Sequence, residues 1–433
     1  MFRKFHRLLI FIFISLILLP VYSESVQPKP GRWSAKTDFG KFEFTVARYS
    51  IMTSITLTFS NWLGRSGSVT DYFNWVIINR RFRFNPTFPY YYDDDQWTFE
   101  GIFSETGTTA SGDWRLAIFG KIYYGYWAAT PLPVDSEPIK IVSWNILNYP
   151  GTNGASRDDD FRKVLEELDT DILVVQEMLN QAGVNQFLNN GLNQSFPNTY
   201  KAAPFFNGPD KDNALFYKEG ILKLISHQQI STAFRDISEY VLEIQEGLSQ
   251  GTQFRIYSVH LTSGSSPSNK NKREEEARIL RDYLNGLPPN SLFLICGTFY
   301  MKSSKENAFK ILTGNQNDND GRSKDPTNKK GKWHNKKKFR KIHTQSTRTS
   351  KFGKGATGGL DDRYDLILAS YGLNKSTKLT YAANSYMAYG NDGKHFNKAI
   401  NKGKNKSVDK KIANALHEAS DHLPVIIELK PPE

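Results

Sequence analysis

The sequence predicts an α/β domain preceded by a small all-β domain, and three observations support this prediction. The chain has 433 residues, enough for two domains with at least one sizeable core. Between positions 24 and 135, segments rich in aromatic and β-branched residues alternate apolar and polar side chains. After position 136 the pattern changes, and apolar strands alternate with amphipathic helices, as expected of an α/β fold.

The first 23 residues have the features of a signal peptide. Basic residues lead into an apolar run at positions 8–19, which is too short to span a bilayer, and the small residue Ser23 follows. No later apolar run reaches the length of a membrane-spanning helix. We therefore expect an exported protein, secreted or periplasmic, without stable membrane insertion.

Residues 24–135 are expected to form a small β-sandwich. Short alternating segments such as QWTFEGIF at positions 96–103 are separated by Gly, Ser, Asn and Asp, and helical periodicity is absent. The Pro-containing stretch at 129–138 is then predicted to be a linker.

Residues 136–433 are predicted to form the α/β domain. Six apolar segments are expected to be strands, at 139–144, 171–177, 254–261, 291–296, 364–370 and 423–429. Helices are expected at 159–168, 271–287 and 303–314, and in the last of these Ser303 and Glu306 have the spacing of a capping pair.

Cysteine usage and net charge limit the possible classes of protein. The only cysteine is Cys296, so no intrachain disulfide forms, and its place in an apolar strand predicts a buried core residue rather than a reactive thiol. The formal net charge of +12 favours polyanionic partners such as nucleic acid, phospholipid headgroups or acidic polysaccharide, without choosing among them.

The positive charge is concentrated in residues 322–354, which hold 13 Lys or Arg and a single acidic residue, Asp325. We expect a long surface excursion here, either a solvated basic loop or an arm that contacts phosphates. Trp333 and Phe339 within it would either stack on bases or anchor the loop to the body of the domain.

Polar residues recur at the ends of the predicted strands. A single polar residue at such a position is usually a cap or a turn residue, but sites in α/β folds gather where strands end. Repetition over five strands therefore predicts a functional site formed by Asn145, Glu177, His260, Asp365 and the pair Asp421–His422.

The order of these motifs resembles the endonuclease/exonuclease/phosphatase family, which includes pancreatic-type deoxyribonuclease, abasic-site endonucleases, inositol polyphosphate 5-phosphatases and neutral sphingomyelinases. The resemblance extends from about residue 138 to the end of the chain, and some stretches also look like secreted bacterial members. The matching motifs are S-W-N (143–145), Q-E (176–177), V-H-L (259–261), G-T-F-Y (297–300), Y-D-L-I-L (364–368) and S-D-H-L-P-V (420–425).

This resemblance implies a four-layered αββα sandwich that hydrolyses phosphoesters with a divalent ion, normally Mg²⁺, with Mn²⁺ and Ca²⁺ as alternatives. Glu177 would hold the ion, with Asn145 and Asp421 beside it, since a hard cation takes oxygen ligands. Phosphoester-containing nucleic acid is the expected substrate and partner, and no obligate protein partner is expected.

The resemblance also implies roles for the remaining site residues. His422 would stand near the developing charge, Asp365 would orient its ring, and His260 would lie over the phosphate. The spacing of Arg273 and Glu276, one helical turn apart, favours a surface ion pair over a role in the site. Candidate substrate-binding residues are Lys336, Lys337, Lys338, Arg340 and Arg363.

The chain departs from the family pattern in the turn after residue 297. The family has Asp and Asn where this chain has Thr298 and Tyr300. A threonine hydroxyl is no base at neutral pH, and loss of a general base costs ~10²–10⁴-fold in rate. Loss of one transition-state donor costs ~10²–10³-fold. Because the other site residues are retained, the change is either recent or a deliberate alteration of an active parent.

Three functions compete at this stage. The first is a secreted Mg²⁺-dependent nuclease or phosphodiesterase with severely reduced activity. The second is a catalytically inactive protein that binds polyanions such as DNA. The third is a phosphoesterase acting on phospholipids or inositol phosphates, which we rank lower because the α/β domain has no apolar insertion loop.

Overall fold

The computed structural model describes residues 31–37, 40–47, 51–62, 65–76, 81–84, 96–104, 109–118, 121–131, 138–151, 155–208 and 211–432. The chain divides into two compact units, one that ends at Val134 and one that begins at Asp135. The predicted signal peptide at residues 1–23 lies outside the described residues. Within the described part of the chain, every helix is too short or too polar to cross a membrane.

The first unit is all-β, as the sequence predicts. Its strands are β1 (Gly31–Thr37), β2 (Gly40–Ala47), β3 (Ile51–Trp62), β4 (Arg65–Val76), β5 (Arg81–Phe84), β6 (Gln96–Phe103), β7 (Ala110–Ile118) and β8 (Lys121–Pro131). They form one continuous antiparallel sheet in the order β4-β3-β2-β1-β8-β7-β6-β5. The predicted strand QWTFEGIF is β6.

Alternation along the strands builds a core in this first unit. On β7, Ala110 and Trp114 are buried while Asp113 and Arg115 are exposed, which is the period of two expected of a half-buried strand. The buried Trp33 ring packs edge-to-face against Phe103, with ring centroids 5.0 Å apart. Aromatic side chains thus supply the apolar area that holds this small unit together.

The second unit contains two mixed sheets. The strands of the first are β9 (Ile139–Tyr149), β10 (Ile172–Met178), β11 (Tyr200–Ala202), β12 (Asp212–Lys218), β19 (Thr380–Tyr381), β20 (Met387–Ala388) and β21 (Val425–Lys430). Their order is β11-β12-β10-β9-β21-β19, with β20 also paired to β21. The second sheet has the order β13-β14-β15-β16-β18-β17, formed by β13 (Leu222–Ile230), β14 (Ile237–Ile244), β15 (Gln253–His260), β16 (Phe293–Thr298), β17 (Ser323–Lys324) and β18 (Asp365–Ser370).

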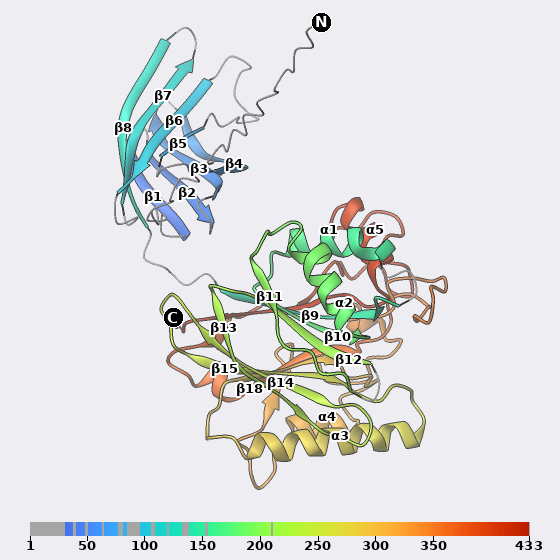
Figure 1. The fold of residues 1–433 in the computed structure, drawn as a ribbon. Helices are drawn as coiled ribbons and strands as arrows, with labels where there is room; N and C mark the ends of the chain where they lie inside the picture. Colours follow the sequence, from blue (N-terminus) through green and yellow to red (C-terminus); the bar gives the residue numbers. More distant parts are fainter. Residues whose placement is uncertain are drawn as a thin grey trace, which may run out of the picture. The chain divides into compact units, whose positions relative to one another are not determined.

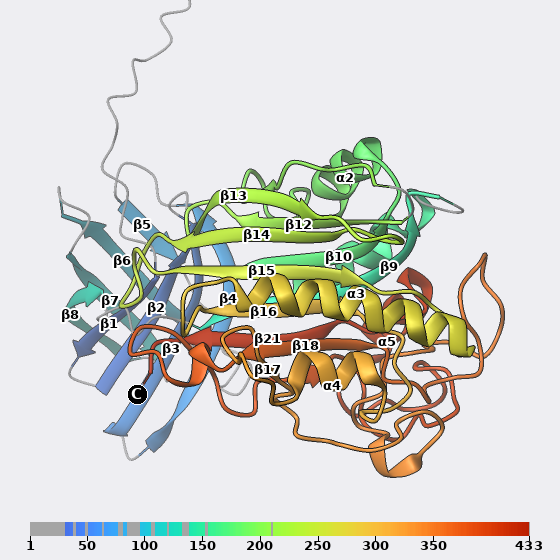
Figure 2. The same cartoon turned by 90° about the horizontal axis from the view of Figure 1, so that it is seen from below.

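Helices cover the outer face of each sheet (Figures 1 and 2). The first sheet is covered by α1 (Asp158–Leu168), α2 (Gln181–Gln186) and α5 (Lys410–Ala419), and the second by α3 (Pro267–Asn285) and α4 (Asn307–Thr313). Single-turn helices are η1 (Ala155–Arg157), η3 (Lys337–Phe339) and η4 (Gly372–Asn374), and η2 (Phe187–Leu192) is a π-helix. The layers follow the order helix, sheet, sheet, helix, which confirms the predicted αββα sandwich.

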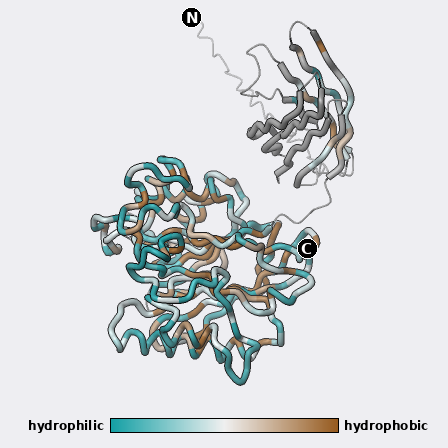
Figure 3. The backbone as a smooth tube through the Cα atoms, turned by 180° about the vertical axis from the view of Figure 1, so that it is seen from behind, coloured by the Kyte–Doolittle hydropathy of each residue, from teal (hydrophilic) through white to brown (hydrophobic). Residues whose placement is uncertain are grey.

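Three apolar clusters fill the spaces between these layers. One packs α1 and α5 on the first sheet, one lies between the sheets, and one packs α3 and α4 on the second sheet. Figure 3 shows the apolar strands inside the unit and the polar loops around them. Cys296 is buried in the cluster between the sheets, where burial raises the pKa of its thiol, so the predicted core role is confirmed.

The predicted capping pair before α4 is wrong in detail. The helix begins at Asn307, and the Ser303 hydroxyl donates to the Gly331 carbonyl instead of capping the helix. The Glu306 carboxylate accepts a bond from the backbone of Lys302 at 2.8 Å and another from Arg273 at 2.8 Å. These neighbours compete for the two side chains, and a sequence pattern of four residues does not show them.

The basic segment 322–354 is not the continuous surface excursion that its charge suggests. Trp333 is fully buried and Phe339 nearly so, and both pack in the cluster beneath α3 and α4. The two rings therefore anchor the segment to the body, which leaves them no free face for a base. Residues 343–348 are also buried, whereas Lys336–Lys338 in the middle of the segment and positions 349–351 near its end are exposed.

Arg363, predicted to bind substrate, is instead a buried structural residue. Its side chain is fully buried, and its guanidinium donates to both carboxylate oxygens of Asp325, at 2.6 and 2.9 Å. Burial alone would raise the pKa of the Asp325 carboxyl, but Arg363 holds that pKa below its usual value. Charge composition could not reveal this pair, because Asp325 lies 38 residues earlier in the sequence.

Replacing Arg363 should therefore destabilise the fold rather than only weaken substrate binding. Arg363→Met leaves the Asp325 carboxylate buried without its partner, which costs about 3–5 kcal/mol of unfolding free energy. Urea denaturation measures this loss, and Lys336→Met at the exposed tip is the matched control, with a change below about 0.5 kcal/mol. Equal effects of the two substitutions would show that the Arg363–Asp325 pair contributes no stability.

Candidate active site

Strand register in the second sheet aligns three of the predicted site residues. His260, the last residue of β15, pairs with Thr298 at the end of β16. Thr298 in turn pairs with Asp365 at the start of β18. The three residues therefore form one row across adjacent strands, and all three are buried.

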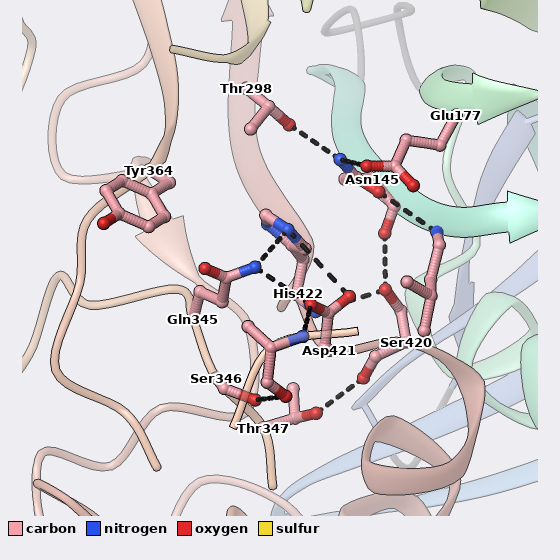
Figure 4. Close-up of polar contacts among 12 residues, drawn as sticks. Asn145, Glu177, Thr298, Gln345, Ser346, Thr347, Tyr364, Ser420, Asp421 and His422 are labelled. Carbon is pink, nitrogen blue, oxygen red and sulfur yellow. Dashed lines mark hydrogen bonds and ion pairs between the residues drawn. The ribbon is translucent and has the colours of Figure 1, made fainter. Parts of the chain in front are cut away.

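The first sheet contributes Asn145 and Glu177 from the parallel strands β9 and β10. Glu177 lies at a register shift between Gln176 and Met178 and has a φ of 65°, a conformation that non-glycine residues rarely adopt. Such a bulge re-aims a side chain, as bulges beside active sites often do. The Glu177 carboxylate consequently accepts a hydrogen bond from the Asn145 amide at 3.2 Å (Figure 4).

The G-T-F-Y turn has a positive φ at two positions, Gly297 and Tyr300, and few residue types adopt this backbone conformation. Gly297 has a φ of 144°, and a Cβ there would lie 1.9 Å from the Val259 carbonyl oxygen, so glycine is required. Tyr300 has a φ of 51°. Asn is favoured in this left-handed region and a bulky aromatic residue is not, so Tyr300 stands in a conformation that suits the residue it replaces.

The Thr298 hydroxyl is engaged by two neighbours. It donates to the Asp365 carboxylate at 2.8 Å and accepts from the Asn145 amide at 3.2 Å. Asn145 thus joins Glu177 on one side to Thr298 on the other. With both partners in place, the hydroxyl bridges the two sheets as a structural group.

His422 is held by carboxylates from both sheets. Its Nδ1 lies 2.7 Å from an oxygen of Asp365, and its Nε2 lies 3.9 Å from an oxygen of Asp421. Burial alone would lower the pKa of the imidazole, but the charges of Asp365 and Asp421 raise it to about 9. The ring is therefore a cation at neutral pH.

Glu177 has a cationic neighbour that the sequence analysis missed. The Lys211 ammonium lies 3.0 Å from the Glu177 carboxylate. Burial alone would raise the pKa of this carboxyl, but its neighbours His260, Lys211 and His422, in that order of effect, lower it to about 2. Lys211 falls in a polar loop between predicted strands, and nothing in its local sequence distinguishes it from other surface lysines.

His260 and Tyr300 stand beside the same carboxylate. The Nε2 of His260 and the hydroxyl of Tyr300 are each 3.5 Å from Glu177, and 3.4 Å from one another. Burial lowers the pKa of His260 to about 3, so this ring is neutral and its contact with Glu177 is no ion pair. Arg235 adds positive charge, with its guanidinium 3.3 Å from the same ring nitrogen.

Gln345 is a further site residue that sequence reasoning missed. Its amide nitrogen lies 3.0 Å from Asp421 and 2.6 Å from His422 Nε2 (Figure 4). A protonated ring cannot accept from an N–H, so while His422 is charged the hydrogen bond of this N–H is the one to the Asp421 carboxylate. Gln345 comes from the buried part of the basic segment. In the sequence, the only local feature that could have pointed to it is the polar stretch H-T-Q-S-T-R at residues 343–348.

Other predicted residues lie outside this cluster. Lys336, Lys337 and Lys338 are exposed and Arg340 is half-buried, and within the described part of the chain none of the four has a hydrogen bond or ion pair with the site. They therefore supply charge on the surface rather than groups at the reacting centre.

Arg273 and Glu276 are not the surface ion pair that their spacing favoured. Both are fully buried. Arg273 donates to the carbonyls of Thr262 and Gly264, each at 2.7 Å, and Glu276 accepts from the Thr262 backbone at 2.9 Å. The two side chains hold the loop that follows His260, so their role is structural.

The site has the chemistry of a divalent-cation centre. Glu177 is an ionised, buried carboxylate with a cation already at hydrogen-bond distance. The Oδ1 atom of Asp421 is buried and has no hydrogen-bond partner among the described residues, which leaves an acceptor for a further positive charge. Oxygen donors of this kind suit a hard cation such as Mg²⁺.

The sequence of the second unit matches a known family. The profile of the Endonuclease/Exonuclease/phosphatase family matches residues 142–422, which is more than half of the chain. The chain therefore belongs to this family, a lineage of divalent-metal-dependent phosphoester hydrolases. No curated protein matches the chain.

Solved structures of this fold are similar to the chain only distantly. TDP2 from D. rerio, crystallised with a single-strand DNA product, is 13% identical, and the match covers 68% of this chain and all of that one, with a TM-score of 0.46. The human nocturnin catalytic domain is 16% identical over 68% of this chain and 94% of its own, with a TM-score of 0.41. SmcL is 14% identical over 67% and 98%, with a TM-score of 0.42.

The raised pKa of His422 predicts a pH dependence of stability. In the unfolded chain the imidazole titrates near 6.5, and in the folded, metal-free protein near 9. The contribution is therefore fully present below about pH 6.5 and is lost as pH rises through about 9. NMR titration of the ring should give this value, and Asp365→Asn should lower it. A pKa near 6.5 in both proteins would contradict the coupling.

Proposed function

We propose that this chain is a secreted, Mg²⁺-dependent phosphodiesterase of nuclease type with severely reduced turnover. The observation that carries the proposal is the Thr298 hydroxyl, which donates to Asp365 and accepts from Asn145 within a site whose other expected residues, apart from the one at position 300, are present. The rest of the site has the groups that phosphoester hydrolysis requires, but position 298 supplies no base. Secretion rests on the signal-peptide features of residues 1–23.

Glu177, Asn145 and Asp421 would hold the divalent ion. When bound, Mg²⁺ would polarise the phosphoryl oxygens and stabilise the charge that develops on the leaving group. Lys211 would have to yield its place beside Glu177, or share it, as the ion enters.

His422 is the residue best placed to support the reaction. Its cationic ring, oriented through Nδ1 by Asp365, can stabilise negative charge or donate a proton through Nε2. His260, neutral at pH 7, can donate a hydrogen bond to a phosphate without adding charge. Neither residue replaces the missing base, because His422 is already protonated.

Tyr300 also works against turnover. Its ring lies among Tyr364, His260 and His422, with the nearest centroid 5.3 Å away, so it fills space beside the reacting centre. Burial raises the pKa of its hydroxyl well above 10, so the group stays neutral and cannot act as a base. The asparagine of the family turn would place an amide donor here and leave this space open.

Restoring the two family residues should restore activity. In Thr298→Asp/Tyr300→Asn, the carboxylate supplies the base and the amide supplies the donor, so we expect a rise of at least ~10²-fold. The two effects need not multiply, because residues at one site act as a unit. Plasmid nicking and bis(p-nitrophenyl) phosphate hydrolysis in Mg²⁺ measure the change.

The control adds Glu177→Gln to the restored protein, which should abolish the gain and show that it depends on the metal carboxylate. The panel also includes RNA, nucleotides, inositol phosphates and sphingomyelin vesicles, so that the substrate class is read from the same experiment. A folded double variant inert on every substrate would refute the proposed hydrolase function.

A second candidate function is binding of nucleic acid without turnover. The exposed lysines 336–338 favour it, since they present charge in the middle of a segment that is anchored at Trp333 and Phe339. Such binding releases counterions, so the affinity should fall steeply with salt.

Replacing Lys336, Lys337 and Lys338 with Met should weaken DNA binding and reduce the slope of log K against log salt by up to about 3. Fluorescence anisotropy between about 50 and 200 mM salt measures both quantities. Lys310→Met, Lys375→Met and Lys378→Met remove the same charge elsewhere and serve as the control. If the two triple variants bind equally, the basic segment is no DNA contact.

A further inference from the structure

A second cluster of metal-ligating side chains lies outside the site described above. His334 belongs to the basic segment, and Asp361 and Asp362 lie just before β18. One ligand atom from each of the three lies within 4.8 Å of the others. The His334 Nδ1 and an Asp362 oxygen are 2.8 Å apart. This is close to the separation of two adjacent ligands on one ion whose bonds are about 2.0–2.2 Å long.

The two carboxylates have no Lys or Arg partner at ion-pair distance among the described residues, and the positive charges that act on Asp361 are His334 and the more distant Lys302. Both carboxylates lie beside the most basic segment of the chain. Asp362 is mostly buried and contacts the ring of His334 and the hydroxyl of Tyr364, neither of them a Lys or Arg, and the Asp361 carboxylate accepts no hydrogen bond from any described residue. Adjacent carboxylates without a cation repel one another.

The cluster is joined to the first site through the backbone. Asp362 and Gln345 exchange two backbone hydrogen bonds, of 3.0 and 3.1 Å, and Asn335 donates to the Asp361 carbonyl at 2.8 Å. Gln345 is the residue whose amide contacts Asp421 and His422. An ion that fixed His334 to Asp361 and Asp362 would therefore fix the backbone that presents Gln345.

We propose that His334, Asp361 and Asp362 bind a divalent cation that accepts both nitrogen and oxygen ligands, such as Mn²⁺ or Zn²⁺, and that this ion positions Gln345. One imidazole and two carboxylates form a common ligand set for such ions. His334 is one-third exposed, which gives the ion a path from solvent. The site is independent of the hydrolase proposal, because it shares no ligand with Glu177.

The test counts Mn²⁺ sites on the metal-stripped full chain by EPR of the free ion. His334→Gln should bind one Mn²⁺ fewer per chain than the unaltered protein, whereas Glu177→Gln should keep the His334 site. His417→Gln is the matched control, because His417 pairs with Glu418 at 2.6 Å without a third ligand, and its site count should not change. Pulsed EPR should detect imidazole nitrogen coupled to Mn²⁺, lost only in His334→Gln.

Equal site counts for His334→Gln and the unaltered chain would overturn the proposal, as would loss of all binding in Glu177→Gln. If His334→Gln does not fold, Asp361→Asn serves as the test variant instead. The Asp361 side chain has no hydrogen bond to a described residue, so this change should leave the fold intact. The link to Gln345 is tested with Zn²⁺, which should shift the Gln345 side-chain amide signals in the unaltered protein. Binding without such a shift would overturn the positioning role.

Discussion

The buried contact between His422 and Asp365 is the interaction on which the site depends. Asp365 begins β18 in one sheet, and His422 precedes β21 in the other, so their 2.7 Å contact joins the two sheets at the end where the polar residues gather. Removing both charges from water carries a large penalty, which the pair offsets only while both partners are present. This explains why the ring is cationic and why its orientation is fixed before any substrate arrives.

The same constraint shows how the chain tolerates threonine at position 298. A side chain there must bridge Asp365 and Asn145, and a hydroxyl can donate to one and accept from the other. The fold therefore needs only a small polar group at this position, whereas chemistry needs a carboxylate. Tyr300 is different, because its left-handed backbone conformation favours asparagine over tyrosine. Folding and catalysis thus place separate demands on positions 298 and 300 of one turn.

Six of the thirteen described strands of the second unit and most of the site followed from local pattern, because buried strands need apolar runs and the site lies at their ends. The strands β12, β13 and β14 were not predicted. Asn145, Glu177, His260 and Asp365 were visible in this way. Gln345 and Lys211 were not, since both come from long polar segments whose paths depend on contacts distant in sequence. Arg273 and Arg363 were misjudged for a related reason. A charged residue is usually exposed, and only the fold shows the carbonyls or the carboxylate that allow its burial.

The basic segment 322–354 combines two roles that composition alone cannot separate. Its ends are held by buried groups, with Arg363 paired to Asp325 before the exposed lysines and Gln345 seated on Asp421 and His422 after them. The exposed lysines Lys336–Lys338 therefore lie on the same segment as Gln345, which contacts Asp421 and His422 in the candidate active site. A polyanion that contacts Lys336–Lys338 contacts the same segment that supplies Gln345 and His334. The exposed lysines and Gln345 therefore lie on one length of backbone that is held by buried contacts on both sides of the lysines.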